Sequence, residues 1–290
     1  MTFFDRRTTR FHIPGRLPVR LVWIFFVAAA QAQNWPSFRG PQATGILETR
    51  GVPISWDVET NRNMAWRTLI PGLGHSSPIV WGDRIYVTSA VSNDPQSVFQ
   101  YPLAGQIDRR TDLAKHQFKV FCLDKRSGKV LWEKVAAEME PRVARHPHNS
   151  YASATPATDG KRVIAFFGSE GLYAFDLDGN LLWKQDVGAL DQGAFDVPDY
   201  KWGNASSPIL YKDLVIVQCD QQKESFLASF VAATGKQVWR TEREGLDDGY
   251  LFHWVRSPRS PARSAPHHAH RRHAAHPRAG GAAVGRPSGR

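Results

Sequence analysis

One short stretch recurs along the chain and constrains its fold more than any other feature. Its clearest copy occupies residues 121–132 and reads FCLDKRSGKVLW. It combines an apolar strand, an Asp, a polar turn ending in Gly128, a second strand and a terminal Trp. Further copies end at Trp183 and Trp239, so this Trp returns at intervals of about 50 residues. A chain with such regularity is expected to stack copies of one small unit.

A second motif, in which Pro follows two small residues, keeps phase with the first. Its copies occupy residues 76–78, 154–156 and 206–208. Short runs of β-branched and aromatic residues lie between the motifs, separated by Gly, Asp and Asn turns, as in β-strands. A period of about 40–50 residues with four short strands per copy is typical of β-propeller blades. The sequence therefore predicts an all-β fold of the β-propeller type.

The repeat predicts about three blades plus a closing strand, in an incomplete ring. Propellers typically have about four to eight blades. The fragment at residues 64–67 resembles the last strand of another copy, and we expect it to complete a final blade. In the first copy, a polar insertion at residues 91–117 separates strands expected at 84–88 and 118–123.

The residues that repeat have structural uses. Asp accepts backbone N–H groups in tight turns, Gly adopts the positive φ that such turns need, and a buried Trp contributes roughly 25 cal/mol per Å² of apolar area. We predict structural docking roles for these positions: Asp124, Gly128, Trp132, Asp176, Gly179, Trp183, Gly235 and Trp239.

The net charge of +10 does not belong to the predicted propeller. Residues 1–32 contain five Arg and one Asp, and residues 251–290 contain eight Arg and no acidic residue. The part between these ends is nearly neutral. Nucleic-acid binding proteins concentrate basic residues on a folded face, so nucleic acid is not expected as a partner.

The first 32 residues have the form of a signal peptide. Five Arg precede the apolar run at residues 21–30, and Ala30-Gln31-Ala32 fits a cleavage site with small residues. The apolar run is short for a membrane span, although an uncleaved anchor is the alternative. Cleavage would leave no stable span and place the protein in the periplasm or otherwise outside the cytoplasm. No Cys follows the cleavage site, which argues against a lipid anchor.

The character of the sequence changes after the third copy, and residues 33–245 are taken as the propeller. Residues 246–290 form an Arg-, Pro-, Ala- and His-rich tail that we expect to be disordered, since its composition cannot form a core. Three interpretations remain open: a genuine basic tail, a metal-binding cluster of five His residues between 267 and 276, or an out-of-frame translation. We favour the last, which would make the chain a truncated propeller.

The repeat, as in Cys122-x-Asp124 with Gly128 and Trp132, resembles the pyrroloquinoline-quinone (PQQ)-like β-propeller repeat. The opening at residues 35–41, WPSFRGP, is similar to the start of a bacterial subgroup of these proteins. The resemblance covers about residues 34–245. The second copy is one residue shorter before its Trp, and the third has Val231 where the pattern has Asp. The repeat implies a fold that hosts unrelated functions.

The resemblance also implies what a quinoprotein dehydrogenase would need: an Asp base, a Glu/Asn/Asp calcium cluster holding PQQ and, in several members, adjacent cysteines. No position matches these residues, and Cys122 and Cys219 are far apart in sequence. We therefore expect a non-catalytic binding or scaffold module that needs no cofactor. The alternatives are a PQQ-dependent alcohol or sugar dehydrogenase using PQQ and calcium, and an outer-membrane protein assembly factor, which the missing lipidation Cys disfavours.

Polar residues before each first strand are the best candidate ligand residues. In a propeller the first strand lies innermost, so these residues would surround the mouth of the central channel and could bind a small molecule or a peptide. The candidates are His75, Asn149, Tyr151 and Asn204. The alternative is that they cap strands. No metal site is predicted, because His146 and His148 alone do not supply a ligand set.

Overall fold

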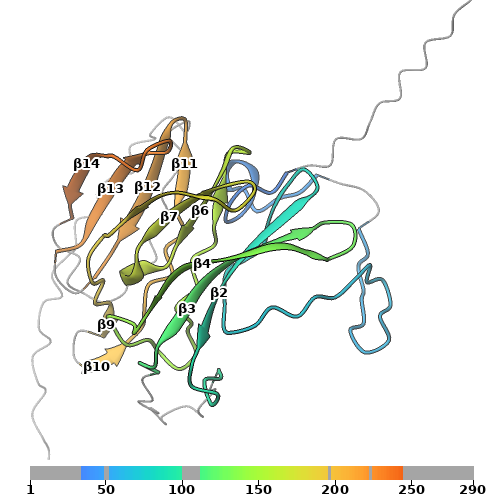
Figure 1. Ribbon diagram of the computed structural model, residues 1–290, viewed down its shortest axis with the longest axis horizontal. Helices are drawn as coiled ribbons and strands as arrows, with labels where there is room; N and C mark the ends of the chain where they lie inside the picture. The colour runs from blue at the N-terminus through green and yellow to red at the C-terminus, as the bar shows by residue number, and fades with distance from the viewer. Residues whose placement is uncertain (1–33, 49–51, 100–111, 195–196, 222–223, 244–290) are drawn as a thin grey trace, which may run out of the picture. The chain divides into compact units, whose positions relative to one another are not determined.

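The structure is a computed structural model that describes residues 34–48, 52–99, 112–194, 197–221 and 224–243. Twelve of its strands form three four-stranded antiparallel sheets, which we call blades 1, 2 and 3 (Figure 1). Blade 1 contains β1 (Ile79–Trp81), β2 (Arg84–Ser92), β3 (His116–Asp124) and β4 (Val130–Met139). Blade 2 contains β5 (Ala157–Thr158), β6 (Arg162–Phe166), β7 (Leu172–Asp176) and β8 (Leu181–Gln185). Blade 3 contains β11 (Ile209–Tyr211), β12 (Leu214–Cys219), β13 (Phe226–Val231) and β14 (Gln237–Glu242).

Each blade is a simple meander in which consecutive strands are hydrogen-bonded neighbours. Two short 3-10 helices, η1 (Pro41–Ala43) and η2 (Gly168–Glu170), are the helical segments of the described residues. The all-β propeller prediction is confirmed, with three blades that do not close a ring within the described part of the chain. No helix there is long and apolar enough to cross a membrane.

Two apolar cores lie between neighbouring blades. One joins blade 1 residues such as Tyr86 and Phe118 to blade 2 residues such as Val163 and Phe175. The other joins the opposite side of blade 2 to blade 3. Successive residues of β6 alternate between the two cores, since side chains along a strand point to opposite faces. Blade 2 is therefore covered on both faces, as the apolar runs in its strands require.

The insertion in blade 1 is shorter than the sequence predicted. β2 and β3 pair continuously from Arg84 opposite Asp124 to Ser92 opposite His116. The prediction ended the second strand at Thr88, but Ser89 and Ala90 are also buried. Burial of these residues favours continued pairing, because their backbone groups need partners away from water.

The fragment at residues 64–67 does not form a hydrogen-bonded strand. Residues 64–70 still alternate strictly, with even-numbered side chains half-buried and odd-numbered ones exposed. That is the pattern of a strand with one covered face, but no strand of the described chain lies along it. An additional small hairpin is formed by β9 (Gly193–Ala194) and β10 (Val197–Lys201), which lie between blades 2 and 3 in the sequence.

The two ends of the chain fall outside the described residues. The predicted signal peptide, residues 1–32, belongs to the first of these ends, and the predicted tail at 246–290 with its His cluster belongs to the second. Both assignments stay predictions.

Candidate functional site: docking positions and channel-side residues

The recurring Trp residues join neighbouring units through one hydrogen bond that is repeated three times. In each case the indole N–H donates to the backbone carbonyl that follows the Asp position of the next turn. The pairs are Trp66 with Lys125 (2.9 Å), Trp132 with Leu177 (3.0 Å) and Trp183 with Ala232 (2.9 Å). Trp66 precedes blade 1, so the fragment at residues 64–67 uses the same contact as the full blades.

The Gly at each of these turns is required by the Trp that covers it. Gly128 and Gly235 have φ of 71° and 72°, a region that favours glycine. A Cβ at Gly128 would lie 2.3 Å from the Trp66 ring, and one at Gly235 would lie 2.7 Å from Trp183. A Cβ at Gly179 would lie 3.0 Å from the Trp132 ring and 2.8 Å from the Lys134 side chain. Turn conformation and ring contact therefore select the same residue.

The Asp positions organise the turns. The Asp124 carboxylate accepts the backbone N–H groups of Arg126 and Ser127, and the Ser127 hydroxyl donates to it at 2.6 Å. Asp176 similarly accepts from Asn180. Hydrogen bonds from the Ser127 and Asn180 side chains are the main reason that the pKa of each carboxyl lies below its usual value. Val231 replaces Asp in blade 3, where backbone bonds close the turn together with a hydrogen bond from the Lys236 N–H to the Thr234 hydroxyl.

The Pro motif carries a second repeated contact, which the sequence analysis did not assign. The Ser77 N–H donates to the Thr155 hydroxyl at 2.9 Å, and the Thr155 N–H donates to the Ser207 hydroxyl at 3.0 Å. Each residue directly precedes the Pro of its motif. The signal was present in the sequence, because this position is Ser or Thr in all three copies.

The last member of each series lacks a partner within the described residues. Trp239 on β14 is 37% exposed, whereas Trp183 is 8% exposed. Its indole N–H and the Ser207 backbone N–H find no acceptor in the part of the chain that the structure describes. Trp239 therefore has the sequence of a docking residue without the contact.

The four candidate channel residues are each held by neighbouring groups. The His75 ring stacks on Phe99 with ring centroids 4.3 Å apart, and the His75 backbone N–H donates to the Ala152 carbonyl. The Asn149 amide donates to the Trp202 carbonyl at 2.6 Å. No hydrogen bond joins any two of the four candidate side chains in the described structure.

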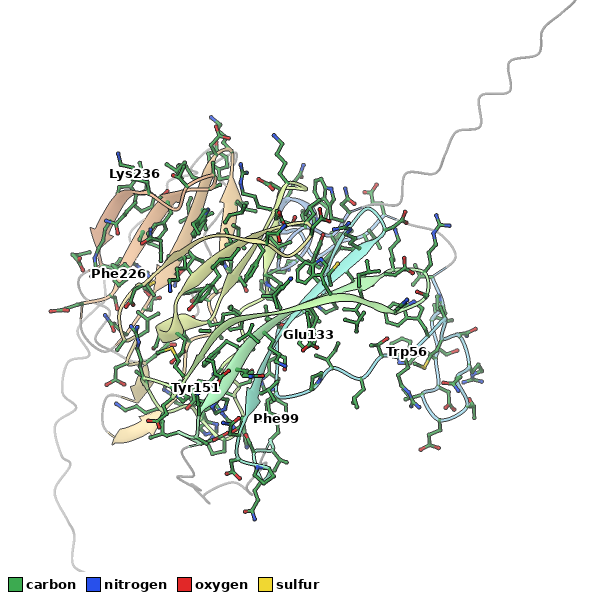
Figure 2. The ribbon with its side chains drawn as sticks, in the orientation of Figure 1. Trp56, Phe99, Glu133, Tyr151, Phe226 and Lys236 are labelled. Carbon is green, nitrogen blue, oxygen red and sulfur yellow. The ribbon has the colours of Figure 1, made fainter. Side chains whose placement is uncertain are left out.

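Tyr151 and Asn204 have contrasting surroundings. The Tyr151 hydroxyl donates to the Asp112 carbonyl at 3.1 Å, and burial raises the pKa of this phenol. Figure 2 shows Tyr151 beside the first residues of β3. Both polar atoms of the Asn204 amide are buried without a hydrogen-bond partner among the described residues. Asn204 is therefore the candidate with unused hydrogen-bonding capacity.

A buried ionic cluster near Tyr151 was missed by the sequence analysis. His116 Nε2 lies 3.2 Å from an Asp112 carboxylate oxygen, and its Nδ1 lies 2.6 Å from the Ala114 carbonyl. The Arg145 guanidinium lies 3.8 Å from the same carboxylate oxygen and donates to the Asn149 carbonyl at 2.6 Å. Burial lowers the Arg145 pKa. The cluster links the start of β3 to the connection after β4, and no spacing in the sequence predicts it.

Glu170 is the buried carboxyl with the most altered titration. It lies in η2, where burial raises its pKa to about 7. One of its oxygens accepts the Arg142 backbone N–H at 3.0 Å, while the Arg142 side chain pairs with Asp186 at 2.7 Å. The contact ties the connection between blades 1 and 2 to η2.

The described residues contain no group of three or more His, Cys, Asp or Glu side chains placed to hold a metal ion. His146 and His148 pack edge to face with ring centroids 4.7 Å apart, and His146 also stacks on Trp202. Burial is the main cause of the lowered His146 pKa. Cys122 and Cys219 are free and buried, in different blades.

A family model described as outer membrane protein assembly factor BamB matches residues 41–252. The match covers more than half of the chain. The chain belongs to this PQQ-like repeat family.

A solved structure titled europium-containing methanol dehydrogenase is similar to this PQQ-like repeat protein, with 18% sequence identity and a TM-score of 0.38. The match covers 61% of this chain and 26% of the enzyme, so the chain spans about a quarter of that protein. Among curated proteins, none matches.

The described residues of this PQQ-like repeat protein do not form a set that fits a calcium-held quinone. Such a site needs several oxygen ligands around one ion. In the described residues the buried carboxylates are already engaged, Asp112 by His116, Glu170 by the Arg142 N–H and Asp220 by Arg243. The unpaired Asn204 amide is a single donor and acceptor group without a carboxylate cluster beside it.

Proposed function

We propose that this chain is a non-catalytic, protein-binding scaffold that acts outside the cytoplasm. The observation that carries the proposal is the apolar surface of residues 52–69, which we call the arm. Ile54 is 99% exposed, Leu69 is 91% exposed and Trp56 is 66% exposed. Figure 2 shows Trp56 on the arm, away from the three sheets. Exposed apolar side chains gathered on one segment are typical of a protein interaction site.

The use of the repeated residues supports a scaffold role. The docking Trp, Gly and Asp residues pack blades or close turns, and the Ser and Thr residues before each Pro link one blade to the next. These residues hold the fold and leave its surfaces to bind partners. The proposal includes no cofactor.

Location rests on the predicted signal peptide, since its Arg residues, apolar run and cleavage motif are those of an export signal. A role in outer-membrane protein assembly is a second candidate, favoured by the description of the family model that matches residues 41–252. Both candidates require a protein partner.

Site-specific photo-crosslinking tests the proposal. A photoreactive amino acid in place of Trp56 is expected to form a discrete adduct with a cell-envelope protein, and Ile54→Ser should weaken that adduct. The matched control places the same group at Arg126, which is also exposed but lies on a blade turn. Equal adducts from both positions, or none from position 56, would contradict a binding role for the arm. Adducts with outer-membrane assembly proteins would favour the second candidate.

The dehydrogenase alternative needs a separate assay. The purified protein is mixed with PQQ, calcium and an artificial electron acceptor, and then with an alcohol or glucose. We expect no substrate-dependent reduction of the acceptor. Sustained turnover would overturn the non-catalytic assignment.

A further inference from the structure

The outer face of blade 3 has the structure of a blade interface, but no neighbouring blade covers it among the described residues. In every blade, one row of side chains crosses all four strands and ends at the docking Trp. The paired positions are Ile79, Tyr86, Cys122 and Trp132 in blade 1, Ala157, Ile164, Ala174 and Trp183 in blade 2, and Ile209, Ile216, Ser229 and Trp239 in blade 3. The rows of blades 1 and 2 are each covered by the following blade, whereas in the row of blade 3 Ile209 and Trp239 are each 37% exposed.

Polar groups on this face are also left without partners in the described structure. The Trp239 indole N–H and the Ser207 backbone N–H are the donors that, in the earlier blades, reach a turn carbonyl and a hydroxyl. The Ser229 hydroxyl is buried and has no hydrogen-bond partner. The face therefore offers the same two donors as the two interfaces that are formed.

Blade 1 offers the complementary face. Ile85 and Val87 of β2 point away from blade 2 and are only half-buried. The residues equivalent to Ile85 are Val163 in blade 2 and Val215 in blade 3, and both are fully buried against the blade before them. The Ser77 hydroxyl, equivalent to the Thr155 and Ser207 hydroxyls that accept a bond, has no partner among the described residues. Donors without acceptors on blade 3 thus match an unused acceptor on blade 1.

We propose that a second copy of this chain docks head to tail, so that blade 3 of each copy packs on blade 1 of the other. Two such contacts close a two-fold ring. Two copies together bring six of the described blades into one ring, within the range of about four to eight that propellers adopt. Three copies would bring nine described blades, which lies outside that range. This inference goes beyond the proposed function, and rests on blades 1 and 3 instead of the arm residues around Trp56.

The dimer requires Trp239 to displace Trp66 of the partner copy. Trp66 occupies the Lys125 carbonyl and the Gly128 surface, which is where an incoming Trp239 would dock. Residues 64–70 have no strand partner that would hold them in place, so the exchange breaks few backbone bonds. Trp66 is therefore an internal competitor of association.

Opposite effects of two Trp substitutions test the proposal. Sedimentation velocity of the full chain is expected to show a concentration-dependent dimer. Trp239→Ala should abolish the dimer, whereas Trp66→Ala should lower the dissociation constant at least tenfold. Leu182→Ala, which removes an exposed apolar side chain from β8 of blade 2 and so lies outside both faces and the arm, should leave the dissociation constant unchanged. A monomeric wild-type chain at about 100 µM would overturn the proposal, as would a dimer that survives Trp239→Ala.

Disulfide trapping distinguishes the head-to-tail arrangement without relying on stability. Trp239→Cys and Lys125→Cys variants, prepared separately and then mixed, should form a heterodimeric disulfide. Cys122 and Cys219 are buried and do not compete. Trapping of Trp239→Cys with itself in place of the mixed pair would show a different interface and overturn the proposal. Occupation of blade 3 by residues 244–290 or by another protein would appear as a monomer with no mixed disulfide, and would overturn it too.

Discussion

At the scale of single residues, the contribution of a Trp side chain to stability depends on its environment. Trp183 is almost fully buried and donates to the Ala232 carbonyl, while Trp56 is largely exposed. We expect Trp183→Ala to lower the free energy of unfolding by about 3–5 kcal/mol, because it leaves a cavity and an unpaired carbonyl. Trp56→Ala should change it by less than about 0.5 kcal/mol. Urea denaturation measures both. Similar losses for the two variants would refute the docking role of Trp183.

Two glycines separate the cost of backbone conformation from the cost of a blocked docking contact. Gly82 and Gly235 both have positive φ, 59° and 72°, but a Cβ at Gly82 would meet nothing within 4 Å. We expect Gly82→Ala to cost about 1 kcal/mol, from the left-handed conformation alone. Gly235→Ala should cost a further 1–3 kcal/mol or so, because its Cβ would overlap the Trp183 ring. Equal losses in thermal or urea unfolding would mean that Trp183 does not restrict this position.

At the scale of structural elements, η2 makes stability depend on pH. The Glu170 pKa is raised from 4.5 to about 7 by burial. Below pH 4.5 both the folded and unfolded states are protonated. Between pH 4.5 and 7 only the unfolded state releases the proton, so the free energy of unfolding should fall by an amount on the order of 3 kcal/mol and then level off. Glu170→Gln keeps an acceptor for Arg142 and should remove this fall, which urea titrations at pH 5 and 8 measure.

Glu138 on β4 is the matched control for this titration. A hydrogen bond from Lys115 is the main cause of its lowered pKa, so its contribution to stability is present at neutral pH and is lost as the pH falls. Glu138→Gln should therefore differ from the wild type most at neutral pH and least in acid. If Glu170→Gln followed the same direction as Glu138→Gln, the buried carboxyl would not be protonated in the folded state.

The elements differ in how well the sequence predicted them, and the reason is the range of the interactions. The strands of blades 2 and 3 follow from local alternation and turn residues such as Gly179 and Gly235. The lengths of β2 and β3 depend on pairing between residues far apart in sequence, which local pattern does not contain. The fragment at residues 64–67 shows the converse, because its strand pattern is local while a hydrogen-bonded ladder needs a neighbour.

The same distinction applies to the candidate site. The residues before the first strands could be named from the repeat, but their partners lie in other segments, as with Asn149 and the Trp202 carbonyl. The Asp112, His116 and Arg145 cluster could not be named, since one residue precedes β3, one begins it and one follows β4. A single sequence reports the repeated positions of a propeller better than the contacts that occur once.

At the scale of the whole molecule, coverage of the blades predicts an order of stability. Repeat proteins gain stability from each unit and from each interface between units. β6 of blade 2 contributes Ile164 to one core and Val163 to the other, whereas every residue of β14 in blade 3 is exposed. We expect amide hydrogen exchange, followed by mass spectrometry at low protein concentration, to be slowest in β6 and β7 and faster in β13 and β14.

A substitution at one interface makes this order a stricter test. Trp183 lies between blades 2 and 3, so Trp183→Ala should accelerate exchange throughout β12 and β13 while leaving β2 and β3 of blade 1 close to their original rates. Trp132→Ala, at the other interface, should instead affect blades 1 and 2. Uniform acceleration of all three blades by either variant would show that they open as one cooperative unit. In that case the interfaces would not act as separate sources of stability, because loss of either would be felt equally by every strand.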